Sequence, residues 1–83
     1  MLLTLTEKKA YIDSDFKKSA LVNMPKLPAD LDGQREWWRS AMRSARAFND
    51  KYADKGEASH QYAIELTTDW METLERMFRK GQL

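Results

Sequence analysis

Hydrophobic positions along this chain recur every three or four residues, the period of an α-helix, and nowhere sustain the alternation of a β-strand. Helix-breaking residues interrupt the pattern at three places: residues 25–28, Asp32-Gly33 and Gly56. The pattern therefore predicts an all-α protein, a compact three-helix bundle that forms a single domain over residues 1–83. We expect helices at about residues 5–22, 33–54 and 57–79, with the last two forming an antiparallel hairpin.

The first predicted helix begins at a capping box. Thr4 stands three residues before Glu7, the spacing at which each side chain can bond the backbone N–H of the other residue. One apolar face follows the helical period after this cap. Its members are Leu5, Ile12, Phe16 and Ala20.

A proline-containing segment separates the first two predicted helices. Pro25 and Pro28 each disfavour the α conformation in the preceding residue, so residues 23–28 are expected to be ordered but not helical. Leu27 and Leu31 are expected to fix this segment to the core.

The second predicted helix has the most regular amphipathic pattern. Asp32 is its expected N-cap, and Gly56 is the expected left-handed residue beyond its C-terminal end. Its apolar positions fall within an arc of roughly 140°, a width typical of a helix that faces a core. These positions are Trp37, Trp38, Ala41, Met42, Ala45, Phe48 and Tyr52.

The third predicted helix carries two apolar stripes. The main face consists of Tyr62, Ala63, Leu66, Trp70, Leu74 and Met77. A second seam beside it consists of Ile64, Met71 and Phe78, which are spaced by seven. A helix in a three-helix bundle needs a narrower face than both stripes together, so the seam either packs on the first helix or forms a surface for self-association or partner docking.

A row of arginines at helical spacing borders the apolar face of the second predicted helix. The row consists of Arg35, Arg39, Arg43 and Arg46. It could bind phosphates or an acidic protein surface, with Trp37 as an aromatic anchor in a pocket of the partner. Alternatively the row is a solvated face, partly neutralised by Glu36 and Asp50, which lie within a turn of it, and by Glu72 and Glu75 of the third helix. In that case both Trp37 and Trp38 close over the first helix and the proline segment.

Composition narrows these alternatives. The 83 residues include 14 Lys and Arg against 13 Asp and Glu, so the net charge of +1 provides no general field for a polyanion. The chain has no cysteine, which excludes a disulfide framework, a thiol nucleophile and a cysteine metal site. A protein partner is therefore favoured over nucleic acid.

The sequence contains no recognisable catalytic, cofactor or metal site. His60 has no second histidine or cysteine to complete a metal set, and Asp13-Ser14-Asp15 has no neighbouring nucleophile. We expect a protein that is not an enzyme. The N-terminal MLLTLTEKK lacks the basic start of a signal peptide, and no apolar run approaches membrane-spanning length, so a cytoplasmic location without membrane contact is expected.

Three short motifs occur in a familiar order. Thr6-Glu7, Asn23-Met24-Pro25 and Arg35-Glu36-Trp37-Trp38-Arg39 are distantly similar to the order of features in the theta subunit family of bacterial DNA polymerase III, small helical proteins that bind the proofreading subunit. The similarity covers about half of the chain, and the long third helix stands where that family has a flexible tail. The resemblance implies a non-catalytic binder of a larger enzyme.

Together these features favour a small non-catalytic protein-binding module. It would act as a stoichiometric inhibitor or adaptor of a larger protein, in the style of a phage- or plasmid-type effector. One alternative is a nucleic-acid-binding protein that uses the arginine row. Another is a structural subunit that assembles with itself, for example as a homodimer through the seam at Ile64, Met71 and Phe78.

Overall fold

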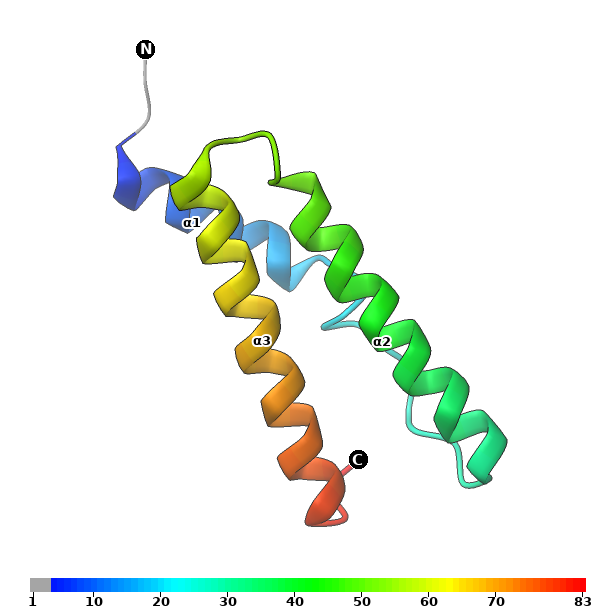
Figure 1. Ribbon diagram of the computed structural model, residues 1–83. Helices are drawn as coiled ribbons and strands as arrows, with labels where there is room; N and C mark the ends of the chain where they lie inside the picture. Colours follow the sequence, from blue (N-terminus) through cyan, green and yellow to red (C-terminus); the bar gives the residue numbers. More distant parts are fainter. Residues whose placement is uncertain (1–3) are drawn as a thin grey trace.

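A computed structural model describes residues 4–83, and three helices form its framework (Figure 1). They are α1 (Leu5–Lys17), α2 (Leu31–Lys51) and α3 (Glu57–Arg79). Helices α2 and α3 form the antiparallel hairpin, and α1 crosses behind it near its closed end (Figure 1). The prediction of an all-α three-helix bundle is confirmed. Residues 1–3, which begin the stretch considered above for a signal peptide, lie outside the described residues.

Helix α1 begins as predicted and ends earlier than predicted. Thr4 accepts a hydrogen bond from the backbone N–H of Glu7, and the Glu7 carboxylate accepts one from the N–H of Thr4. The helix ends at Lys17, not near residue 22, because polar side chains of the next turns take over its last carbonyl groups. The Ser19 hydroxyl donates to the carbonyl of Phe16, and the Asn23 amide donates to the carbonyl of Lys17.

The early end of α1 determines which apolar residue reaches the core. In a continuous helix, Ala20 would lie one turn after Phe16 on the same face, as the sequence predicted. In the structure Ala20 is exposed and Leu21, with 1% of its surface exposed, is buried instead. The turn after α1 thus buries Leu21 in place of the smaller Ala20, and the larger apolar side chain gains more free energy from burial.

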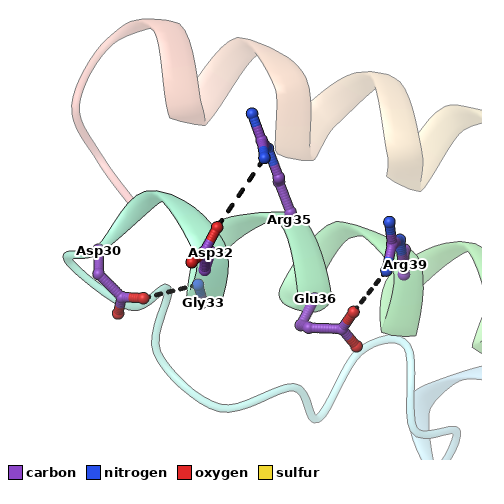
Figure 2. A network of polar contacts seen from close by, with 6 residues as sticks. All are labelled: Asp30, Asp32, Gly33, Arg35, Glu36 and Arg39. Atoms are coloured by element: carbon purple, nitrogen blue, oxygen red, sulfur yellow. Dashed lines mark hydrogen bonds and ion pairs between the residues drawn. The ribbon is translucent and has the colours of Figure 1, made fainter.

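Helix α2 begins at Leu31 and ends at Lys51, so it starts two residues and ends three residues before the predicted bounds. The N-cap is Asp30, not Asp32, and its carboxylate accepts a 2.7 Å hydrogen bond from the N–H of Gly33 (Figure 2). Gly33 suits this position because a Cβ there would lie 2.7 Å from a carboxylate oxygen of Asp30 and 2.8 Å from the Cβ of Pro28.

The hairpin turn contains Gly56, which the sequence predicted as the left-handed residue at the C-terminal end of the second helix. That role is corrected, because α2 ends at its C-cap Tyr52 and Gly56 is the N-cap of α3. Gly56 has a φ of 99°, which glycine adopts without the steric cost that other residues incur. It directly precedes α3, whose bounds of 57–79 match the prediction. Gly81, with a φ of 69°, follows the C-terminal end of that helix.

One face of the hairpin is covered by α1 and by the linker, defined here as residues 18–30. In Figure 1 both lie behind α2 and α3. The covered face contains two groups of buried residues. The first is Ile12, Phe48, Tyr52 and Ala63, and the second is Leu21, Trp37, Ala41 and Leu74. Phe16 packs against both groups, with edge-on ring contacts to Phe48 and Trp70, and therefore joins them into one core.

Two tryptophans and a glutamine hold the linker against the hairpin. The Trp37 indole N–H donates to the carbonyl of Pro25 at 2.7 Å, and that of Trp70 donates to the carbonyl of Leu21 at 3.3 Å. The Gln34 amide donates to the carbonyl of Pro28. Because an extended segment has no internal hydrogen-bond ladder, these side chains satisfy carbonyl groups that packing would otherwise leave unpaired.

Two aspartates of α1 connect it to the hairpin. Asp15 accepts hydrogen bonds from the Tyr52 hydroxyl at 2.6 Å and from the Lys51 ammonium at 3.1 Å. Asp13 accepts a 2.7 Å hydrogen bond from the Tyr62 hydroxyl. The Tyr52 hydroxyl lowers the pKa of Asp15, with a smaller contribution from Lys51 and partial opposition from burial. Burial and the bond to Asp15 raise the pKa of Tyr52.

We predict that Tyr52→Phe lowers the free energy of unfolding by about 1 to 2 kcal/mol at pH 7, because it removes a hydrogen bond to a charged group. The lowered pKa of Asp15 gives stability that is present above its unfolded pKa of about 3.9 and is lost as pH falls further. The raised pKa of Tyr52 gives stability that is present below about pH 10 and is lost as pH rises further.

Urea unfolding of the wild type and of Tyr52→Phe at acid, neutral and alkaline pH measures both effects. The difference between the two proteins should be largest near neutral pH and should shrink towards both extremes. Tyr11→Phe, which changes an exposed tyrosine, is the control and should follow the wild type. A difference in unfolding free energy that is the same at every pH would contradict the stabilising role assigned to the hydrogen bond between Tyr52 and Asp15.

We also predict that Gly33→Ala destabilises the protein by about 1 kcal/mol, although alanine is the better helix former. The new methyl group would displace Asp30 or Pro28 and weaken the cap. Thermal unfolding provides the measurement, and Ser40→Ala, farther along α2, is the matched control. Equal or higher stability of Gly33→Ala would show that the cap tolerates the methyl group.

Candidate interaction surface

The predicted arginine row lies on the surface of α2. Arg35, Arg39, Arg43 and Arg46 are all exposed. Within the described residues their ion pairs are with acids of the same helix. Arg35 lies 3.8 Å from Asp32, and Arg39 lies 2.7 Å from Glu36 (Figure 2). Arg43 lies 3.9 Å from Glu36. The partial neutralisation expected from Glu36 therefore occurs, whereas no ion pair joins the row to Asp50, Glu72 or Glu75 in the described residues. Exposed pairs contribute roughly 0 to 1 kcal/mol, so a partner can displace them at little cost.

Only one of the two adjacent tryptophans reaches the surface. Trp37, with 7% of its surface exposed, is buried under the linker through its bond to Pro25. It is thus a core residue, and its expected placement as a surface anchor for a partner is corrected by this burial. Trp38 is half-buried, and its ring lies edge-on to Trp37 at 4.9 Å and to Phe78 of α3 at 5.9 Å.

The apolar seam of α3 lies along α2, on the side away from α1. Ile64 and Met71 line a groove between the two helices, together with Met42 and Ala45 of α2. Phe78 continues this seam towards the open end of the hairpin, where it contacts Trp38. The alternative in which the seam packs on α1 is therefore wrong.

This side of the hairpin forms one continuous surface, which we call the open face. Its apolar part consists of Leu31, Trp38, Met42 and Ala45 of α2 and Ile64, Met71 and Phe78 of α3. Its α2 rim consists of Arg35, Arg39, Arg43 and Arg46, and its α3 rim consists of Glu72 and Glu75. Several of these residues line the groove or the adjoining hollow around Met42. Helical spacing places Leu31 on the same side as Trp38 and Arg35 on the same side as Met42, because seven residues complete nearly two turns.

The open face carries large apolar side chains in contact with solvent. Leu31 is 62% exposed, Met42 is 58% exposed and Phe78 is 42% exposed. The sequence placed Leu31 and Met42 in the core. Met42 occupies the edge of the predicted apolar arc, next to the arginines, and that edge position was the available signal that it could be exposed.

The rest of the described chain offers little catalytic chemistry. Asp13 and Asp15 are engaged by tyrosines, and His60 is half-buried at one end of the groove. Within residues 4–83, no three acidic or histidine side chains gather as metal ligands. Over the same residues, no helix has the length and apolar character needed to span a bilayer.

Comparisons with protein-family models, with curated proteins and with solved structures find no match for this chain. No family model, curated protein or solved structure thus supports the similarity to the theta subunit family. The open face is interpreted from its own residues.

We predict that Trp37→Phe lowers the free energy of unfolding by about 1 kcal/mol, because the partly buried hydrogen bond to the carbonyl of Pro25 is lost while the aromatic packing is largely kept. Trp38→Phe is the matched control and should cost less, since Trp38 is only half-buried. Urea unfolding of both variants makes the comparison. A larger loss for Trp38→Phe than for Trp37→Phe would contradict the structural role assigned to Trp37.

Proposed function

We propose that this protein is a non-catalytic binding module that uses its open face to contact a larger protein, as a stoichiometric inhibitor or adaptor. The observation that carries the proposal is the exposure of Met42 among the arginines of the row. An apolar centre with a rim of charged side chains is the usual composition of a protein interface. Arginine and aromatic residues also supply many of the contacts that dominate binding energy.

The charges of the open face favour a protein over nucleic acid. The α2 rim is basic and the α3 rim is acidic, and Glu72 and Glu75 line the same groove as Arg46. A phosphate backbone that lay on the arginines would meet these carboxylates nearby, and the net charge of +1 provides no compensating attraction. A protein surface can present both signs at once.

The shape of the open face suits a helix of the partner. A groove between two antiparallel helices accepts the apolar side of a third helix, whose residues spaced by three and four fill it as anchors. The complementary helix would carry acidic residues towards Arg39 and Arg43 and basic residues towards Glu72 and Glu75. This specification guides the choice of partners to be tested.

Affinity capture with the purified chain as bait tests the proposal. We expect a protein that is retained in a fixed molar ratio by the wild type and is lost at least about tenfold with Met42→Glu or with the triple variant Arg39→Ala/Arg43→Ala/Arg46→Ala. The triple variant Lys17→Ala/Lys26→Ala/Lys55→Ala removes equal charge from exposed sites elsewhere and should retain the protein. Circular dichroism checks that every variant is folded.

Binding to a short DNA duplex at low and physiological salt tests the nucleic-acid alternative. The proposal predicts no measurable binding at physiological salt. Affinity for the duplex that falls steeply with salt and is lost in the arginine variant would instead support nucleic-acid binding. Equal capture by the wild type and both open-face variants would contradict the proposed surface.

A further inference from the structure

The described chain leaves the open face uncovered. Three of its exposed large apolar side chains, Leu31, Met42 and Phe78, lie on this face, whereas Leu5 and Tyr11 lie on α1. The fold measures 50 × 21 × 17 Å, and its shortest dimension is that of two layers, the hairpin and its cover of α1 and linker. A second layer on the open face would bury Met42, Phe78 and Leu31. A chain of this length gains substantially from such burial, because its own core is small.

A second copy of the hairpin has the surface composition that a partner of the open face needs. Its open face carries an apolar stripe with a basic rim on α2 and an acidic rim on α3. Two copies can stack these faces with a two-fold axis along the helices, so that α2 of each copy lies on α3 of the other. They can also stack with the axis across the helices, which places α2 on α2 and α3 on α3.

The charges distinguish the two arrangements. With the axis across the helices, the row of Arg39, Arg43 and Arg46 would face the same row of the second copy, and Glu72 and Glu75 would face their own counterparts. Like charges placed together across an interface are strongly unfavourable. With the axis along the helices, each basic rim meets an acidic rim.

The register of the hairpin supports the pairing of α2 on α3. The contacts of Trp38 with Phe78 and of Asn49 with Thr67 show which residues of α2 and α3 are level. A two-fold axis along the helices preserves these levels between copies. Arg43 of one copy is then within one turn of Glu72 of the other, in an antiparallel pair of helices.

The same register places Arg39 of one copy within one turn of Glu75 of the other. Only the ends of the face have rims of like sign: Arg35 approaches the level of Arg79, and Asp50 approaches that of Glu65. The attraction is therefore concentrated at the centre of the face, around Met42 and Met71.

We infer that, when no larger partner is bound, a second copy of this chain covers the open face, with α2 of each copy packed on α3 of the other in a four-helix interface. This inference rests on the proposed use of the open face for protein binding. A larger protein and the second copy would then compete for one surface.

Sedimentation equilibrium of the pure full-length chain over micromolar to millimolar concentrations tests the inference. We expect a dimer whose dissociation constant rises at least about 100-fold in Met42→Glu, because dimerisation would bury an unpaired carboxylate. Tyr11→Glu places the same charge on an exposed apolar position of α1 and should still dimerise. A wild-type chain that is monomeric throughout this range overturns the inference.

Charge exchange tests the arrangement of the two copies. Arg39→Glu/Arg43→Glu and Glu72→Arg/Glu75→Arg should each be monomeric alone and should form a dimer when mixed. The variant with all four substitutions should dimerise with itself and should not pair with the wild type. Pairing of this fourfold variant with the wild type would indicate α2 on α2 and would overturn the proposed arrangement.

The two proposals fail in different experiments. A monomeric wild type that still captures a larger protein through Met42 and the arginines removes the dimer and leaves the proposed function. A wild-type dimer that depends on Met42, combined with no captured protein, supports the dimer and removes the binding of a larger protein.

Discussion

A hairpin of two long helices has two faces, and in this chain α1 and the linker cover only one of them. Helix α1 is 13 residues long and crosses the hairpin near its turn, so it covers only that end. The linker covers the remaining length of the same face, where Trp37 and Trp70 bind its carbonyl groups. No described segment is left to cover the opposite face. The open groove is therefore a direct result of how the chain is divided between elements.

The covered face accounts for the cohesion of the fold. Its two groups of buried residues meet at Phe16, and the aspartates of α1 bind Tyr52 and Tyr62, which belong to or pack against the first group. Every buried polar side-chain atom in the described residues has a hydrogen-bond partner. The polar groups on this side are thus used to position helices. The arginines on the other side have only exposed pairs within their own helix, which leaves them free to exchange partners.

Local signals in the sequence predicted much of the fold. The Thr4–Glu7 capping box and the bounds of α3 each depend on residues within a few positions of one another. The end of α1 was not predictable in this way, because Ala20 fits the helical period better than Leu21 and only the packing of the whole chain favours the larger residue. Asp32 was predicted as the N-cap of α2, but the helix begins earlier, at Leu31, and Asp30 caps it.

The candidate surface was predictable only in part. Exposure of the arginines followed from their position beside the apolar arc. The choice between Trp37 and Trp38 did not, because the two residues lie at opposite edges of that arc and the covered edge depends on where the linker runs. The position of the seam had the same difficulty, since Ile64 and Met71 could have faced α1 or α2. These questions concern which neighbour a helix faces, and helical periodicity does not contain that information.

The separate environments of the tryptophans give the protein a built-in spectroscopic probe. Trp37 and Trp70 donate to linker carbonyls, so their emission reports whether the linker is docked. Trp38 touches Phe78 at the edge of the open face, and its emission responds to the polarity of whatever lies there. With Trp37 and Trp70 replaced by phenylalanine, the remaining indole would signal occupancy of the groove without any attached dye.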